Sequence, residues 1–224
     1  DTIRQTTVKI RVIAHNQQVI RIDNEDTGNI QEDKLGEIGI ILDNVLTKTD
    51  GIIIEDYNKG LLTPDSISLI LTKAAARDIP VYVDPKKENF FSYQGVRLFK
   101  PNMTEFNSAL DRENEYKDFE NLGKVLRKKL GTQILMVTRG ERGISLFSDQ
   151  GMHTIETKAR KVHDVSGAGD TAISAFVLAD LAGATIVEAA QISNYAAGRV
   201  CEEVGVVPIT LEMLDEIVEH YNDH

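Results

Sequence analysis

The strongest chemical signal in the sequence is a glycine-rich stretch that ends in a carboxylate and runs into an apolar segment. It reads DVSGAGDT over residues 164–171 and is followed by the apolar run 172–181. Glycine lets a backbone turn tightly and approach a ligand, and the N-terminus of a helix attracts anions. Asp170 would lie in the first turn of that helix, where an acid can take a proton from an attacking hydroxyl. Taken alone, the same letters also fit a plain turn whose acid favours the helix dipole.

Two weaker motifs precede this stretch, and each follows a predicted strand. The letters NMTE at 102–105 place an amide and a carboxylate three residues apart, where they can share a helical face and hold phosphate or Mg²⁺-bound water. The alternative for this pair is a helix cap. The letters TRGERG at 138–143 contain glycines that let backbone approach a nucleotide, and their alternative is a β-hairpin connection.

Hydrophobic periodicity predicts the elements that must position these motifs. Alternation over residues 7–23 predicts two strands that turn near residues 15–16. Residues 51–54 form a short apolar run, which is typical of a strand buried on both faces. Further strands are expected at 81–83, 96–99, 134–138, 144–147 and 152–156, and helices at 31–46, 64–77, 117–130, 169–182, 186–203 and 211–221.

Strands that alternate with helices predict an α/β fold: a doubly wound, mostly parallel sheet flanked by helices, with a small β lid. Ligands bind such sheets beyond the carboxyl ends of the strands, which is where all three motifs fall. We expect one domain over residues 1–224, with lid strands at about 7–23 and a nucleotide-binding and catalytic part at about 50–224. The chain opens at Asp1 and its first twenty residues resemble the middle of a fold, so we also expect an N-terminal part to be missing.

Composition excludes several classes of function. A formal net charge of −10 argues against nonspecific nucleic-acid binding through a basic surface. No apolar run approaches the length that crosses a bilayer, so we expect no membrane association. Cys201 is the only cysteine, which rules out an internal disulfide and fits a reducing cytoplasm.

In this order and at these strand ends, the three motifs resemble those of the ribokinase-like (PfkB) carbohydrate kinases. The resemblance implies that Asp170 is the catalytic base and that the amides of Gly167, Ala168 and Gly169 form an anion hole. It further implies ATP, Mg²⁺ and, in many members, a monovalent cation such as K⁺. Asn102 and Glu105 would serve the Mg²⁺–ATP phosphates, with the metal held through water. The residues implied along the nucleotide are Thr138, Gly140, Gly143 and Asn194, and those implied at the monovalent cation are Asp164, Ser166 and Gly205.

Other stretches resemble more closely the D-glycero-β-D-manno-heptose 7-phosphate kinases of ADP-heptose and lipopolysaccharide core synthesis. The matching stretches are 6–13, 16–18, 56–60 and 83–86. The resemblance implies phosphorylation of a sugar phosphate at O1, and lid strands that pair two subunits as a homodimer. Cationic side chains in these stretches are candidates for the sugar phosphate, with exposed surface lysines and arginines as the alternative: Lys9, Arg11, Lys59 and Lys86.

Three other functions stay open at this point. The chain could be another kinase of this family that acts on a fructose phosphate, ribose or a nucleoside. It could be a non-catalytic nucleotide-binding protein or an inactive fragment, because the family's N-terminal sugar-binding segment has no counterpart here. A dinucleotide-binding dehydrogenase fits poorly, because its glycine-rich turn should follow the first strand.

Overall fold

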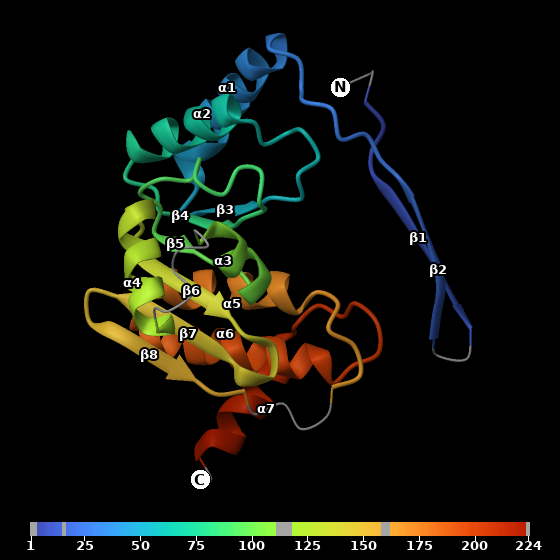
Figure 1. The fold of residues 1–224 in the computed structure, drawn as a ribbon, viewed down its shortest axis with the longest axis vertical. Helices are drawn as coiled ribbons and strands as arrows, with labels where there is room; N and C mark the ends of the chain where they lie inside the picture. Colours follow the sequence, from blue (N-terminus) through green and yellow to red (C-terminus); the bar gives the residue numbers. More distant parts are fainter. Residues whose placement is uncertain (1–3, 15–16, 111–117, 158–161, 223–224) are drawn as a thin grey trace.

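The computed structural model describes residues 4–14, 17–110, 118–157 and 162–222. Within them, a two-stranded ribbon stands beside a six-stranded sheet of order β3-β4-β5-β6-β7-β8 (Figure 1). The strands are β1 (Val8–Ala14), β2 (Gln17–Asn24), β3 (Ile52–Glu55), β4 (Val81–Asp84), β5 (Leu98–Phe99), β6 (Ile134–Thr138), β7 (Ile144–Ser148) and β8 (Gly151–Ile155). The α-helices are α1 (Asp33–Val45), α2 (Pro64–Ala75), α3 (Met103–Ala109), α4 (Phe119–Leu130), α5 (Ala168–Leu181), α6 (Ile186–Cys201) and α7 (Leu211–Asn222).

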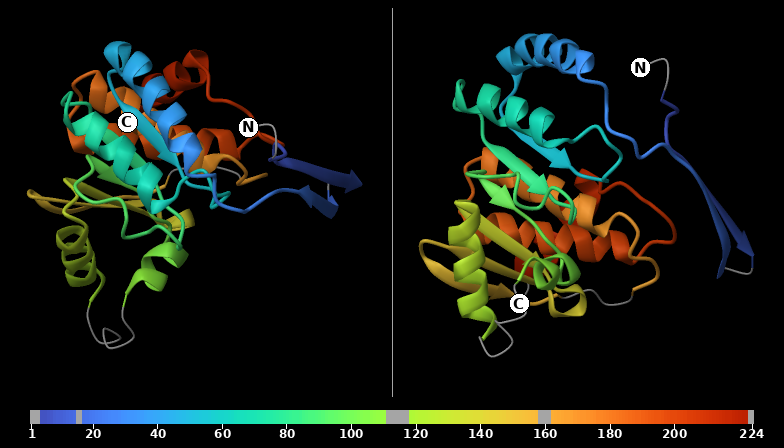
Figure 2. Two further views of the ribbon diagram at one scale, coloured as in Figure 1. Left: turned by 90° about the horizontal axis from the view of Figure 1, so that it is seen from above. Right: turned by 45° about the horizontal axis from the view of Figure 1, so that its top comes forward.

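Helices cover both faces of the six-stranded sheet, which confirms the predicted α/β class (Figure 2). Strands β3 to β6 run parallel, whereas β7 and β8 are antiparallel. Side-chain alternation divides the core, because successive residues of a strand point to opposite faces. Val83 and Phe99 belong to one apolar cluster, with residues of α2, α3 and α4, whereas Tyr82 and Leu98 belong to another, with residues of α5 and α6.

Local signals in the sequence account for where the helices begin. Thr63 caps α2 and forms a reciprocal capping box with Ser66, and Pro64 takes the first helical position. Thr185 and Glu188 form the same arrangement at the start of α6. The six predicted helices agree with α1, α2 and α4 to α7 within two residues at each end, whereas α3 was not predicted.

Strand β3 corrects one prediction. The apolar run 51–54 was expected to be buried on both faces, yet Ile53 is 39% exposed. The reason is the strand's place: β3 pairs with β4 only and forms the edge of the sheet among the described residues. A run of isoleucines cannot tell a central strand from an edge strand, because the difference lies in the neighbours.

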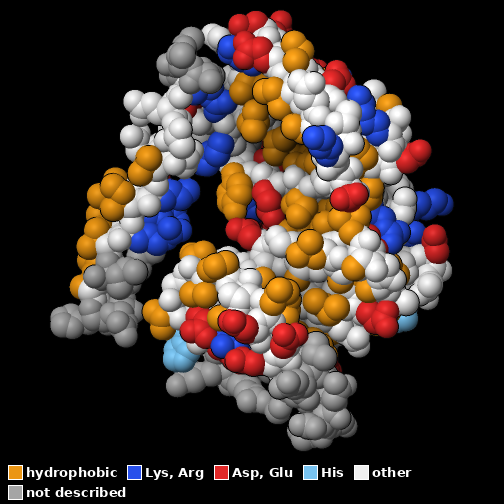
Figure 3. Space-filling model, turned by 180° about the vertical axis from the view of Figure 1, so that it is seen from behind, with side chains coloured by type: hydrophobic (Ala, Val, Ile, Leu, Met, Phe, Trp, Pro, Cys, Tyr) orange, Lys and Arg blue, Asp and Glu red, His pale blue; other side chains and the backbone are white. Residues whose placement is uncertain are grey.

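The ribbon β1–β2 confirms the two strands predicted over residues 7–23, and the predicted turn at residues 15–16 lies outside the described part of the chain. Its antiparallel register pairs Ile10 with Ile22 and Val12 with Ile20, so these apolar side chains share one face. Lys9 and Arg11 take the other face. Figure 3 shows an open gap between the ribbon and the body, with Lys and Arg gathered on the side of the ribbon that faces the gap. No helix in the described ranges is both long and apolar enough to span a membrane.

Candidate active site

The N-terminus of α5 forms the centre of the candidate site. Gly167 is its N-cap residue and adopts φ +83°, a left-handed conformation that strongly favours glycine. This turn places Ala168 and Gly169 at the start of the helix, where N–H groups lack intrahelical partners. Asp170 lies in the same first turn and is exposed. The predicted anion hole and the predicted base are therefore adjacent residues of one helix end.

Two further carboxylates meet Asp170 at the carboxyl ends of β3 and β4. Oxygen atoms of Glu55, Asp84 and Asp170 all lie within 4.8 Å of one another. Glu55 and Asp84 are direct partners in the parallel register of these strands. Burial, followed by the charges of Asp84 and Asp170, raises the pKa of Glu55 to about 7.

A buried lysine lies under the anion hole. Lys100 is only 2% exposed, and its Nζ donates to Asp84 Oδ2 at 2.7 Å. A side chain added at Gly169 would meet Lys100 Nζ at 3.5 Å and Asp84 Oδ2 at 3.8 Å. The Lys100–Asp84 pair therefore packs directly against the backbone of the predicted anion hole.

The loop after β3 brings a phenol to Asp170. The Tyr57 hydroxyl donates to Asp170 Oδ2 at 3.0 Å. Buried Asp56 holds this loop, because its carboxylate accepts from Asn58 N at 2.7 Å and from the Tyr93 hydroxyl at 2.7 Å. Burial and the bond to Asp170 raise the pKa of Tyr57 to about 12, so its hydroxyl stays a donor at neutral pH.

Asn102 and Glu105 form a reciprocal cap at the start of α3, as the alternative from the sequence proposed. Glu105 N donates to Asn102 Oδ1 at 2.9 Å, and Asn102 N donates to Glu105 Oε2 at 2.8 Å. Lys86 Nζ, a candidate for the sugar phosphate, donates to Glu105 Oε1 at 2.7 Å. Each oxygen of Glu105 keeps a second lone pair for a metal-bound water, so the cap and a Mg²⁺ role are compatible. Thr138 forms an isolated parallel bridge with Asn102, which joins two of the predicted nucleotide motifs.

The two glycines of the 138–143 loop differ in their surroundings. Gly140 has φ +59°, and no described atom lies within 4 Å of a side chain added there. Gly143 has φ +73° and ψ −134°, and an added Cβ would lie 2.0 Å from the carbonyl oxygen of Ile155. Gly143 therefore serves the close approach of β8, whereas the space around Gly140 is open to a ligand.

Asn194 is a buried residue of α6. Its Nδ2 donates to the carbonyl oxygen of Glu156 at 2.9 Å, which ties α6 to the chain just after β8. Its contact with a nucleotide stays a prediction, and this hydrogen bond gives the residue a structural role as well.

The residues predicted for a monovalent cation come together. Asp164 Oδ1 accepts from Ser166 N at 2.9 Å. Hydrogen bonds from the backbone and side chain of Ser166 lower the pKa of Asp164, with smaller contributions from the Gly205 N–H and the charge of Arg11. The loop thus holds an ionised carboxylate, and Arg11 of the ribbon is near enough to act on it across the gap.

Lys9 and Lys59 both form ion pairs with Glu25. Lys9 Nζ lies 3.1 Å from Asp23 and 3.3 Å from Glu25, and Lys59 Nζ lies 2.5 Å from Glu25. These pairs link β1 of the ribbon to the loop that carries Tyr57. A sugar phosphate bound by either lysine would therefore compete with Glu25.

Four side chains of this site had no role predicted from the sequence: Glu55, Tyr57, Asp84 and Lys100. Each stands at or just beyond the carboxyl end of a parallel strand, which was the available signal. A lone acid or lysine at such a place is common, however, and only the strand order shows that these four meet.

Comparison with known proteins identifies the family. A family model described as pfkB family carbohydrate kinase matches residues 1–212. The chain belongs to the pfkB carbohydrate kinases. This is a family of phosphotransferases that act on an alcohol group of a sugar, which confirms the class of enzyme expected from the motifs.

Curated relatives and solved structures agree with this assignment. The chain is 38% identical over 215 residues to the bifunctional protein HldE of Nitratiruptor sp. and 37% identical over 217 residues to that of Marinomonas sp.. Each match covers 95% of this chain, and the chain spans 45% and 44% of those relatives. Phosphofructokinase-2 from Escherichia coli has a TM-score of 0.81 at 15% identity, over 98% of this chain and 71% of that one. Ribokinase from Thermotoga maritima has a TM-score of 0.71 at 18% identity, over 96% and 70%. These likenesses confirm the ribokinase-like fold.

Proposed function

We propose that this protein transfers the γ-phosphoryl group of ATP to O1 of D-glycero-β-D-manno-heptose 7-phosphate, giving the 1,7-bisphosphate used for ADP-heptose and the lipopolysaccharide core. One observation carries the kinase part of the proposal. Asp170 lies beside a glycine-rich helix N-terminus at the carboxyl end of the sheet, so a base and an anion site face the same space.

In this proposal Asp170 takes the proton of the sugar hydroxyl as that oxygen attacks the γ-phosphorus. Tyr57 fixes Asp170 Oδ2, and the other carboxylate oxygen, Oδ1, accepts the proton. The N–H groups at Gly167, Ala168 and Gly169 stabilise negative charge on the transferred group. Mg²⁺ would be held through water by Asn102 and Glu105, and when bound it would neutralise charge on the ATP phosphates. Asp164, Ser166 and Gly205 would hold K⁺ beside the anion hole.

The heptose assignment rests on the matching stretches and on relatives named HldE. The stretches at 6–13 and 56–60 contribute the ribbon and the Tyr57 loop, which Lys9 and Lys59 link through their ion pairs with Glu25. Lys9, Arg11, Lys59 and Lys86 supply positive charge for a sugar phosphate, and no comparable positive charge would be needed for an uncharged acceptor such as ribose.

We further propose that additional strands of the same protein extend the sheet at β3. Among the described residues β3 pairs with β4 only and Ile53 is exposed, and folded proteins normally cover such a sheet edge. Such strands would also complete the sugar pocket. The 224-residue chain alone would then bind ATP but phosphorylate the heptose slowly.

An ADP-release assay tests the proposal on two proteins: this chain, and this chain extended at its N-terminus by further natural sequence. The acceptors are D-glycero-β-D-manno-heptose 7-phosphate, fructose 6-phosphate and ribose. We expect the extended chain to prefer the heptose and to exceed the shorter chain in turnover. A preference for either other acceptor would refute the heptose assignment, and equal turnover of both chains would refute the incomplete pocket.

A further inference from the structure

Glu55 is a half-buried acid that the mechanism above does not use. It ends β3 on the face that α5 covers, opposite Asp84 in register and within 4.8 Å of both Asp84 and Asp170. Three carboxylates thus converge at one end of the sheet, next to the anion hole. Burying like charges this close is costly unless a cation or a proton compensates them.

The charged groups that face Glu55 are few. They are Asp84 from β4, Lys100 from just after β5, and Asp170 from α5, while Tyr57 lies on the loop that continues β3. Lys100 is the one cation among them, and its ammonium lies 2.7 Å from Asp84. One positive charge therefore faces three carboxylates, and a proton on Glu55 would bring the net charge of the group from −2 to −1.

We propose that Glu55 is a positioning residue for the base Asp170, and that it acts by sharing a proton with Asp84. The protonated carboxyl of Glu55 donates to Asp84, which stays paired with Lys100 under Gly169. Asp170 is then the only carboxylate of the group without a compensating charge or proton. When Glu55 loses its proton, a second negative charge stands behind the anion hole and opposes the incoming phosphates.

This inference rests on the proposed kinase function, and it predicts a dependence on pH. The pKa of Glu55 is raised from an ordinary value of 4.5 to about 7, so the neutral form dominates below that pH and is lost above it. We expect kcat/KM for Mg²⁺–ATP to fall by roughly tenfold from pH 6 to pH 8. A repulsion between like charges that is worth about one pKa unit produces a change of this size. kcat/KM falls as the pH rises because deprotonation of Glu55 adds negative charge beside the anion site.

The first test compares Glu55→Gln with the unaltered protein in the ADP-release assay between pH 6 and pH 8. The amide cannot ionise and still donates to Asp84, so the ratio of variant to unaltered kcat/KM should rise about tenfold across this range. Titration of ATP and of the sugar phosphate cancels in this ratio. The matched control is Glu120→Gln on α4, an exposed acid paired with Lys124, whose ratio should stay constant. A constant ratio for Glu55→Gln would overturn the proposal.

The second test needs neither substrate nor variant. Carbon-13 NMR of the carboxyl groups in the unaltered protein should show one glutamate titrating near pH 7, with an aspartate resonance shifting at the same pH. Titration of every glutamate below pH 5.5 would overturn the shared proton, whatever the enzyme acts on. If all three acceptors stay unphosphorylated, the proposed function fails, and this titration decides alone whether Glu55 and Asp84 share a proton.

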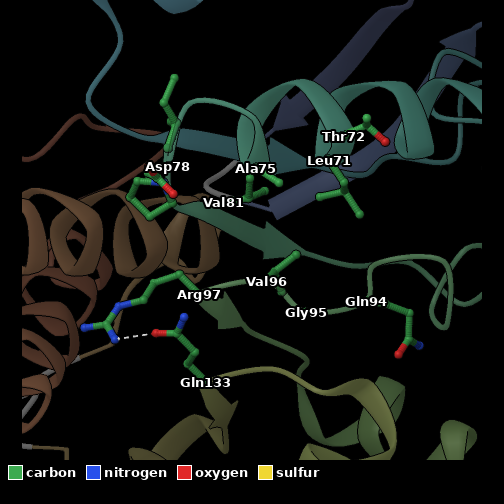
Figure 4. Close-up of a pocket in the computed structure, with 12 residues that line it drawn as sticks. Leu71, Thr72, Ala75, Asp78, Val81, Gln94, Gly95, Val96, Arg97 and Gln133 are labelled. Carbon is green, nitrogen blue, oxygen red and sulfur yellow. Dashed lines mark hydrogen bonds between the residues drawn. The ribbon is translucent and has the colours of Figure 1, made fainter.

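A cavity of about 780 Å³ lies at the opposite end of the sheet, between α2 and the starts of β4, β5 and β6 (Figure 4). Its most polar wall is Arg97, which already pairs with Asp180 and donates to Gln133 Oε1 at 2.8 Å. These bonds occupy the group that would otherwise recognise an anion, so Arg97 serves to hold α5 to the sheet.

Discussion

At the scale of single residues, the proposed base Asp170 is surrounded by side chains that come from three other elements. Tyr57 holds one carboxylate oxygen at 3.0 Å, while Asp84 and Glu55 approach from the strand ends. Lys100 lies behind them and neutralises Asp84.

Replacing Asp170 by asparagine tests its role as the base. The amide keeps the shape of the carboxylate but cannot accept the proton, so kcat should fall by roughly 10²–10⁴-fold. The affinity for ATP, measured by calorimetry, should stay within about threefold, because the anion hole uses backbone N–H groups. Asp149→Asn is a suitable control, since Asp149 is an exposed turn residue that forms an ion pair with Arg127 on α4. Near-normal turnover of Asp170→Asn would remove the assignment.

Replacing Glu105 by glutamine separates its two roles. Glutamine can still accept from Asn102 N through its carbonyl oxygen, so the cap of α3 survives. Its NH2 group cannot accept from Lys86 Nζ, so the melting temperature should fall by a few degrees. The negative charge that orders metal-bound water is lost, so the Mg²⁺ concentration for half-maximal activity should rise several-fold. An unchanged Mg²⁺ titration would show that the Asn102–Glu105 pair is only a helix cap.

At the scale of elements, the 138–143 loop illustrates how one motif can contain two kinds of glycine. Gly140 turns in open space, whereas Gly143 lets β7 begin directly against the end of β8. The sequence gives both the same letter, and only the structure distinguishes a position that can face a ligand from one that serves packing.

Alanine at each position should therefore give different losses of stability. Gly140→Ala adds only the cost of a left-handed conformation, about 1 kcal/mol, or roughly 2–4 °C in Tm for a chain of this size. Gly143→Ala adds a contact of 2.0 Å with a backbone oxygen, so the strands must shift and the loss should be at least twice as large. Thermal unfolding followed by circular dichroism measures both. Equal losses would mean that β8 moves freely away from Gly143.

The helices and strands also show which features of the fold and of the candidate site the sequence could predict. Periodic helices such as α2 and α6 were predicted because their signals are local. Asp170 could be proposed from the sequence because its motif is contiguous. Glu55, Asp84 and Lys100 were not assigned, because their meeting depends on the order β3-β4-β5, which no local pattern encodes. The exposure of Ile53 was missed for the same reason.

At the scale of the whole molecule, the ribbon β1–β2 stands away from the body with one face uncovered (Figure 1). The apolar side chains of this face are about half exposed: Val8, Ile10, Val12, Ile20 and Ile22. An isolated two-stranded ribbon is marginally stable in water, so it needs a partner surface. A second copy of the same face offers one, because a twofold axis brings identical apolar patches together.

We therefore predict a homodimer that is held together by the apolar faces of the two ribbons. A double substitution tests this prediction. Ile10→Asp with Ile22→Asp would place four carboxylates in the symmetric interface, each costing at least about 2 kcal/mol to bury. Light scattering after size exclusion should show a dimer for the unaltered chain and a monomer for the variant. Val125→Asp on α4 is the matched control, since Val125 is also about half exposed but lies far from the ribbon in sequence and on another element.

Loss of the dimer should also lower turnover, because the ribbon carries Lys9 and Arg11 over the gap. It should leave ATP binding intact, because the predicted anion hole belongs to α5. A monomeric unaltered chain, or a variant that stays dimeric, would show that another surface covers this face.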